Sequence, residues 1–154
     1  MNLTSALTIT ATLGPMQDLG LTGRGHRRII PIAGGILDGT APDGTPFHGT
    51  VLPGGADWQV IRPDGVAEVE ARYTLQLSDG TLVLITNRGY RHGPPEVLGR
   101  LATGESVDPS EYYFRTTPIF EVAPGPHDWL TRTVFVATGE RRAAEVIIRV
   151  FRVD

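Results

Sequence analysis

Apolar and polar residues alternate along most of this chain, and the alternation is clearest between Ala67 and Leu77. In that segment the apolar side chains share one face and the polar side chains share the other: Glu68, Glu70, Arg72, Thr74 and Gln76. A period of two residues is typical of a β-strand with one buried face. The turn dipeptide Asp79-Gly80 follows, which favours a hairpin. The pattern therefore predicts antiparallel strands joined by short turns.

Strand-like segments recur from one end of the chain to the other, separated by glycine and proline turns that end or bend a strand. We expect strands over residues 6–13, 27–33, 47–52, 58–62, 67–77, 81–87, 111–122, 129–138 and 143–153. No segment keeps a helical period over three turns, and only residues 95–101 suggest a helical turn. Residues 16–25 and 88–108 are expected to be irregular. The length of the second suggests a lid, a subunit contact or a missed strand.

These strands predict an all-β fold with little helix, in one domain over residues 1–154. Regular up-and-down strands in a chain of this size form a closed barrel or a sandwich. We favour a single antiparallel β-barrel, lipocalin-like or up-and-down. The strands are long, glycines relieve curvature, and closure removes exposed strand edges.

Composition and charge exclude several classes of partner and cofactor. The 154 residues carry 14 basic and 17 acidic side chains, which argues against nucleic acid. There is no cysteine, no apolar stretch long enough for a membrane helix and no signal peptide, so a cytoplasmic location is the default. The four histidines lack the spacing of metal ligands: His26, His48, His92 and His127. The glycine-rich stretch over residues 20–25 has no Walker lysine after it, which argues against nucleotide binding. We expect neither a metal nor a cofactor.

The most unusual stretch joins a Gly54-Gly55 bend to Asp57 and Trp58. An acid beside an indole is rare in a plain turn, and an apolar wall raises the pKa of a carboxyl group. Asp57 is therefore a candidate proton shuttle. It is equally suited to capping the glycine bend through its side chain.

Three further residues complete a set suited to proton transfer next to a carbonyl group. Tyr112 is placed to donate to a developing enolate or alkoxide, and Arg72 or Arg115 to hold an anionic oxygen. Both arginines have the alternative of a structural ion pair. Because neighbouring residues of a strand face opposite ways, at most one of Tyr112 and Tyr113 reaches the pocket.

Candidate ligand-binding residues are aromatic or polar side chains near this set: Trp58, Glu70, Tyr113, Trp129 and His48. Core packing is the alternative for the two tryptophans. A ligand-binding role for Glu70 depends on which face of its strand points into the barrel. If Glu70 and Arg72 point inward, their buried charges need oppositely charged or hydrogen-bonding partners. Alternation more commonly places such a polar face toward solvent.

Several motifs, taken in order, resemble the DUF3237 or UPF0311 family. They are Arg28-Ile29-Ile30-Pro31-Ile32-Ala33-Gly34-Gly35, Val51-Leu52-Pro53-Gly54-Gly55-Ala56-Asp57-Trp58, Ala71-Arg72-Tyr73, Tyr112-Tyr113-Phe114-Arg115-Thr116, Trp129-Leu130 and Arg149-Val150-Phe151-Arg152-Val153. The resemblance covers nearly the whole chain and implies an antiparallel, lipocalin-like barrel. It leaves the chemistry open. His48 falls outside the family pattern, so a role for it would be specific to this chain.

Two functions remain open. One is a cofactor-independent enzyme that uses acid–base chemistry next to a carbonyl group, as an isomerase, a hydratase or lyase, or a cyclase. The other is a barrel that binds a small ligand without turning it over. In both, the expected partner is a small molecule, with no nucleic acid or membrane. The chain is expected to form a homodimer or a larger homo-oligomer.

Overall fold

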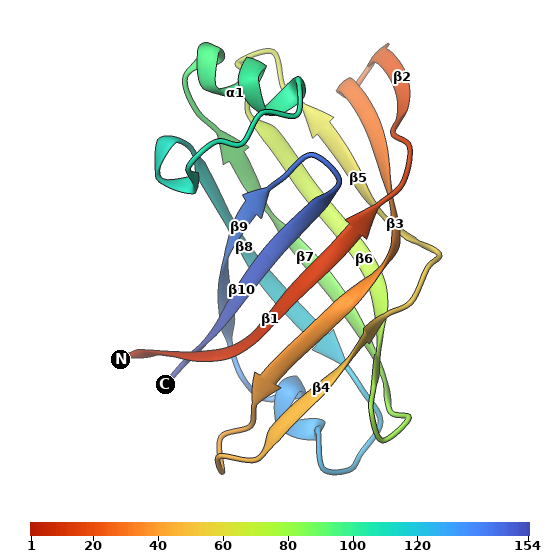
Figure 1. The fold of residues 1–154 in the computed structure, drawn as a ribbon, viewed down its shortest axis with the longest axis vertical. Coiled ribbons are helices and arrows are strands. Elements are labelled where there is room, and N and C mark those ends of the chain that lie inside the picture. Colours follow the sequence, from red (N-terminus) through yellow and green to blue (C-terminus); the bar gives the residue numbers. More distant parts are fainter.

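The computed structural model describes residues 1–154 as a closed antiparallel β-barrel with one short α-helix (Figure 1). The prediction of a single antiparallel barrel with little helix is confirmed. The elements in chain order are β1 (Leu3–Leu13), β2 (Gln17–Thr22), β3 (Gly25–Thr40), β4 (Pro46–Val51), β5 (Gly55–Ile61), β6 (Ala67–Leu77), β7 (Leu82–His92), α1 (Pro95–Ala102), η1 (Pro109–Glu111), β8 (Tyr113–Glu121), η2 (Asp128–Thr131), β9 (Phe135–Arg141) and β10 (Glu145–Val153).

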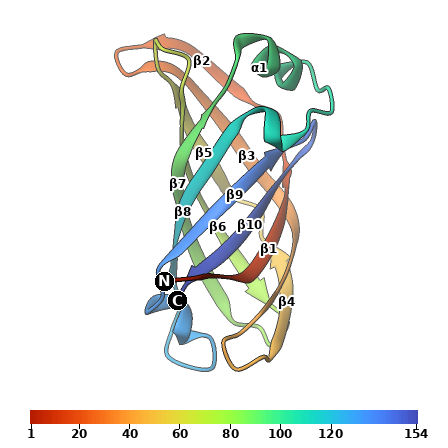
Figure 2. The same ribbon diagram turned by 90° about the vertical axis from the view of Figure 1, so that its left-hand side faces the viewer.

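The ten strand segments fill eight positions around the barrel. β3 is long enough to pair with β1 and β2 on one side and with β4 and β5 on the other. β6 to β10 follow as an up-and-down meander, and β1 closes the ring by pairing with both β10 and β3. In both views α1 and the β2–β3 hairpin lie at one end of the barrel, and η2 lies at the other (Figures 1 and 2).

Five segments differ from the sequence-based prediction. Residues 17–22 form β2, β3 continues through Gly34-Gly35 to Thr40 as one strand, and β7 continues through residues 88–92, which were expected to be irregular. Trp129 lies in the 3-10 helix η2 and not in a strand, and β9 begins at Phe135 and extends to Arg141. Glycines and Pro31 marked residues 17–22 and 31–35 as irregular or interrupted, whereas residues 129–134 were predicted to be strand. The neighbouring strands supply the hydrogen bonds that keep β3 extended.

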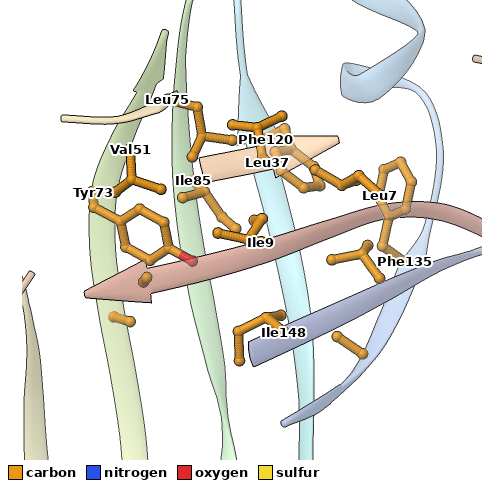
Figure 3. Packing of buried hydrophobic residues seen from close by; sticks show 14 of the residues in the cluster. Leu7, Ile9, Leu37, Val51, Tyr73, Leu75, Ile85, Phe120, Phe135 and Ile148 are labelled. Atoms are coloured by element: carbon orange, nitrogen blue, oxygen red, sulfur yellow. The ribbon is translucent and has the colours of Figure 1, made fainter. Parts of the chain in front are cut away.

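The apolar face of β6 points into the barrel, so Glu70 and Arg72 are on the outer wall, as the commoner arrangement predicts. The half of the barrel toward η2 is filled by close-packed side chains, among them Ile9, Ile85 and Phe120 (Figure 3). Ile9 and Ile85 are completely buried. Burying a side chain of this size contributes about 1.5–3 kcal/mol, so this half supplies much of the stability.

The Gly54-Gly55 bend connects β4 to β5, and each glycine is required for a different reason. Gly54 has a φ of +113°, which a side chain would disfavour. A Cβ on Gly55 would lie 2.3 Å from the carbonyl oxygen of Arg72, so β5 approaches β6 more closely there than any larger residue allows. The bend therefore fixes where β5 enters the barrel wall.

Candidate functional site

A small polar cavity lies inside the barrel, in the half toward α1. Its volume is about 40 Å³, and most of its wall is apolar. The polar side chains that line it are Asp57, Gln59, Tyr73, Asn87, Arg91 and Arg141. They come from β5, β6, β7 and β9, so the site is assembled by the closure of the barrel and not by one local motif.

Asp57 sits where the pairing of β5 and β6 is interrupted. The strands pair at Asp57 with Ala71 and again at Val60 with Glu68, but not between these points. In the gap the Asp57 carboxylate accepts hydrogen bonds from the backbone N–H of Glu70 at 2.9 Å and from Gln59 Nε2 at 3.2 Å. Asp57 therefore does not cap the glycine bend; its carboxylate bridges the gap between the two strands.

Burial raises the pKa of Asp57 above its usual range. The hydrogen bonds from Glu70 and Gln59 oppose that shift, as do the charges of Arg91 and Arg28. Each carboxylate oxygen accepts one of these bonds, and an ionised carboxylate has room for about four. Asp57 thus keeps free lone pairs toward the cavity and an affinity for protons that an exposed aspartate lacks.

Three arginines converge on this end of the barrel. Arg28 donates to Gln59 Oε1 through Nε at 3.2 Å and also through Nη2. Arg91 and Arg141 line the cavity itself. Burial, followed by repulsion from Arg28 and Arg141, lowers the pKa of Arg91 to about 10. The three positive charges are therefore close enough to act on one another.

Tyr73 and Asn87 add neutral polar groups to the same cavity. Tyr73 points its hydroxyl into the barrel (Figure 3), and burial followed by the charge of Asp57 raises its pKa. The Asn87 side chain is buried on β7, and its Oδ1 has no hydrogen-bond partner. A buried, unpartnered amide oxygen is costly in a finished core but is expected where a ligand or water completes the contacts.

Of the residues predicted from sequence, Asp57 and Tyr112 lie at this end of the barrel interior. Tyr112 is buried, and its hydroxyl accepts the backbone N–H of Arg141 at 3.0 Å. It therefore positions the end of β9. Tyr113 points outward, so strand alternation separated the two tyrosines as expected.

Four other predicted residues meet on the outside of the barrel wall. Trp58, Glu70, Tyr113 and Arg115 line an open outer groove of about 1270 Å³. Glu70 pairs with Arg88 at 3.0 Å, and the Arg115 guanidinium lies 5.5 Å from the centre of the Tyr113 ring. This groove is far larger than the inner cavity. However, its charged groups face water, which screens them and weakens their effect on a reacting atom.

The remaining predicted residues lie away from both places. Arg72 is exposed on the outer wall, and His48 is exposed on β4. Trp129 packs at the η2 end against Phe47 and Phe135, with ring centres 6.1 and 6.0 Å away. Core packing, the alternative considered for Trp129, describes its surroundings. The inner cavity therefore contains Asp57 but none of these three residues.

The functional residues predicted from sequence did not include Tyr73, Asn87, Arg91 and Arg141. Strand alternation holds the signal that would have found them. Val83, Ile85 and Asn87 point inward on β7, and two further steps of two residues lead to Arg91. Phe135, Ala137 and Gly139 lead in the same way to Arg141. Both arginines fall in segments that were expected to be irregular or a turn.

Two further features of the structure bear on the site. No three His, Asp or Glu side chains gather into a group that would hold a metal ion. No helix has the length and apolar character needed to cross a membrane.

Comparison with known proteins gives a family. The sequence profile described as "Protein of unknown function (DUF3237)" matches residues 1–153. A UPF0311 protein of Bradyrhizobium diazoefficiens is 45% identical over 146 residues, which cover 95% of this chain and 92% of that protein. A UPF0311 protein of Clostridium acetobutylicum is 37% identical over 155 residues, covering 100% of this chain and 95% of that protein.

Solved structures agree with the fold. A conserved protein of unknown function from Rhodopseudomonas palustris superposes with a TM-score of 0.88 at 42% identity, covering 99% of this chain and 97% of that one. A β-barrel-like protein from Acinetobacter baumannii gives 0.84 at 37% identity, covering 99% and 96%. A structure described as an enzyme from Penicillium herquei gives 0.66 at 20% identity, covering 97% and 93%. That last likeness concerns the fold alone.

Proposed function

This chain belongs to the DUF3237 family, and we propose that it is a cofactor-independent enzyme that moves a proton next to a carbonyl group inside the barrel. The observation that carries the proposal is Asp57. Asp57 is only partly exposed, desolvation raises the pKa of its carboxyl group, and it lines a cavity shared with Tyr73 and two arginines. A carboxyl group whose pKa is raised toward neutrality is suited to general acid–base catalysis.

In the proposed reaction, Asp57 takes the proton from the carbon beside the substrate's carbonyl group. The electron pair of that C–H bond forms a carbon–carbon double bond, and the carbonyl oxygen becomes an enolate. The neutral Asp57 then returns the proton to a carbon, giving an isomer, or to a leaving group, giving elimination. When the leaving group is hydroxide, the reverse sequence adds water across the double bond of the unsaturated carbonyl compound. If a hydroxyl of the same substrate adds to that double bond instead of water, it loses its proton to Asp57, the electron pair of the double bond forms the enolate, and the proton returned to the enolate carbon completes cyclisation.

Tyr73 and Arg91 are the proposed partners of the developing enolate. Both line the cavity with Asp57, and a hydroxyl and a guanidinium donate hydrogen bonds to an anionic oxygen. Because the cavity is enclosed by apolar residues, such donors stabilise charge more strongly there than in water. Tyr112 is proposed as a positioning residue, because its hydroxyl holds the backbone of Arg141.

The size of the cavity limits which part of a substrate enters it. A volume of about 40 Å³ holds water or a small head group, and not a whole drug-sized molecule. The reacting atoms of the substrate are therefore placed in the cavity, with the remainder toward the end of the barrel beside α1 (Figure 2).

The test follows deuterium exchange from D2O into the carbon beside the carbonyl group, by NMR, over a panel of neutral and acidic 2-oxo and 3-oxo compounds. We expect the protein to accelerate exchange for part of the panel. Asp57→Asn is expected to lower that rate by about 10²–10⁴-fold, because it removes the proton acceptor and keeps the size of the side chain.

Asp38→Asn is the matched control, since Asp38 is exposed on β3 and remote from the cavity. It is expected to exchange at the wild-type rate. Undiminished exchange in Asp57→Asn would contradict the role of Asp57. If no compound exchanges faster while a ligand still raises the melting temperature, the protein is a non-catalytic binding barrel instead.

A further inference from the structure

The polar cavity holds more positive than negative charge. Arg91 and Arg141 line it, and Arg28 donates to Gln59 at its wall. Asp57 is the single carboxylate among the lining residues. Asp18, the other carboxylate that acts on Arg28, is hydrogen-bonded to His26 and about half exposed. An ionised Asp57 thus leaves two positive charges unmatched, and a protonated Asp57 leaves three.

No carboxylate of the protein forms an ion pair with any of these three arginines. Arg141 instead donates to backbone carbonyl groups, including that of Glu145 at 3.3 Å. The Arg91 guanidinium lies 5.9 Å from the centre of the Phe114 ring. Such contacts orient the arginines without neutralising them.

Unmatched charge of this kind is expensive to keep inside a folded protein. Loss of water and mutual repulsion together lower the pKa of Arg91 to about 10, yet that still leaves it charged near neutral pH. Most arginines elsewhere in this barrel avoid the cost by pairing with Asp or Glu on the surface. A half-buried charged group that departs from this rule is typical of a site for an oppositely charged ligand.

We infer that the cavity binds the carboxylate group of an acidic carbonyl substrate, an oxo acid, between Arg91 and Arg141. The inference rests on the proposed function, because an oxo acid held there has its carbonyl group beside Asp57 and Tyr73. A planar guanidinium matches a carboxylate through two parallel hydrogen bonds. The cavity of about 40 Å³ suits a planar three-atom group better than a bulkier phosphate.

Asn87 completes the binding site. Its Oδ1 is buried without a partner, and the two ends of an amide side chain are assigned from their hydrogen bonds. A carboxylate only accepts hydrogen bonds, so it pairs with Asn87 when the NH2 group of the amide faces the cavity.

The test uses pyruvate, the smallest 2-oxo acid, and pyruvamide, its neutral amide, titrated into the wild-type protein by calorimetry at constant ionic strength. We expect saturable pyruvate binding at least tenfold tighter than that of pyruvamide. Arg91→Gln and Arg141→Gln are each expected to weaken pyruvate binding about tenfold or more, because a charge-assisted hydrogen bond is lost. Arg132→Gln is the matched control, since Arg132 is exposed on the η2 side.

Equal affinity for pyruvate and pyruvamide, or no effect of either arginine substitution, would overturn the inference. So would inorganic phosphate that competes as tightly as pyruvate. Should Arg91→Gln not fold, Arg91→Lys keeps the charge, removes the planar fork and is expected to weaken binding in the same direction.

Failure of the proposed function gives a different result. If pyruvate binds through the arginines but Asp57→Asn exchanges protons as fast as wild type, the anion site is supported and the catalytic role of Asp57 is contradicted. If instead a neutral carbonyl compound exchanges deuterium as fast as the corresponding oxo acid, and Asp57→Asn abolishes exchange of both compounds, the catalytic role of Asp57 is supported and the anion site is contradicted.

Discussion

At the scale of single residues, the fold places one carboxyl group where its ionisation is unfavourable. Asp57 bridges a gap between two strands, and a neutral amide has the same shape and accepts the same backbone hydrogen bond from Glu70. Its negative charge is therefore not needed to hold the strands. Asp57→Asn therefore tests proton transfer by Asp57 while it keeps the hydrogen bond from Glu70 that bridges the two strands.

We predict that Asp57→Asn changes the pH dependence of stability in a defined direction. The pKa of Asp57 is raised above the ordinary value of 3.8 in the folded state. The bound proton therefore stabilises the fold below pH 3.8, and that contribution is lost as the pH rises through the folded pKa. Relative to wild type, Asp57→Asn should be more stable near pH 7 than near pH 3.

Urea unfolding of both proteins at several pH values measures the difference, and Asp38→Asn corrects for a general effect of removing a carboxylate. A difference in stability that stays constant with pH would show that folding leaves the pKa of Asp57 unchanged. An advantage of Asp57→Asn that grows as the pH falls would show that folding favours the ionised form of Asp57.

Tyr73 gives a second prediction at this scale. Tyr73→Phe removes only the hydroxyl, which points into the barrel interior, and keeps the ring that packs in the core. We expect the free energy of unfolding to change by less than about 1 kcal/mol, because no large cavity forms. Proton exchange is expected to slow by about 10²-fold, as for loss of one oxyanion donor. A large loss of stability with unchanged exchange would assign Tyr73 to packing instead.

At the scale of elements, the position of Asp57 depends on the bend that precedes β5. Gly55→Ala places a methyl group 2.3 Å from the Arg72 carbonyl oxygen and 2.5 Å from Tyr73 Cβ, so β5 must shift away from β6. We predict a loss of about 1–3 kcal/mol in the free energy of unfolding. Proton exchange should fall with it, because Asp57 and Tyr73 are both displaced.

Gly23→Ala is the control for this change, since an added Cβ meets nothing within 4 Å there. It is expected to change stability by no more than about 0.5 kcal/mol. Chemical denaturation of the wild type, Gly55→Ala and Gly23→Ala measures the free energy of unfolding of each protein. A Gly55→Ala variant as stable as Gly23→Ala would rule out the close approach of β5 and β6.

Strands could be predicted from sequence wherever one face is apolar and the other polar. β6 was predicted with its observed limits, because alternation and the Asp79-Gly80 turn agree there. β2 was missed, since most of its side chains are exposed and only pairing with β3 keeps it extended. Trp129 was assigned to a strand because local composition does not reveal that η2 packs at the end of the barrel.

The site was harder to predict than the strands, and for a related reason. Asp57 could be found because it follows an unusual glycine bend. Arg91 and Arg141 lie near the ends of two strands and are 50 residues apart in the sequence. The alternation of inward and outward side chains along each strand does not distinguish them from other residues. Their proximity follows from closure of the barrel, which no local pattern encodes. Arg115 and Arg72 have more conspicuous neighbours in the sequence, but alternation sends both outward.

At the scale of the whole molecule, the outer groove concerns the prediction of a homodimer or larger assembly, which stays a prediction. Trp58 and Tyr113 line that groove and are 39% and 45% exposed. We expect sedimentation velocity to show a mass above that of one chain. A Trp58→Ala variant should then shift toward the monomer, whereas a protein that sediments as a monomer at all concentrations would contradict the prediction.

The barrel interior is divided between stability and function. The η2 half is apolar and close-packed, whereas the α1 half contains half-buried arginines and the unpartnered amide oxygen of Asn87. We predict that Ile85→Ala lowers the free energy of unfolding by about 2–5 kcal/mol, because Ile85 is fully buried and its removal leaves a cavity.

Pyruvate affinity should be unchanged in Ile85→Ala under conditions where the variant is folded, because Ile85 does not line the polar cavity. Val134→Ala, at a side chain 69% exposed, is the control and should alter neither quantity. Unfolding curves and calorimetric titrations on the same samples separate the two effects. Pyruvate binding that weakened in proportion to the stability lost would mean that the two halves of the barrel do not act independently.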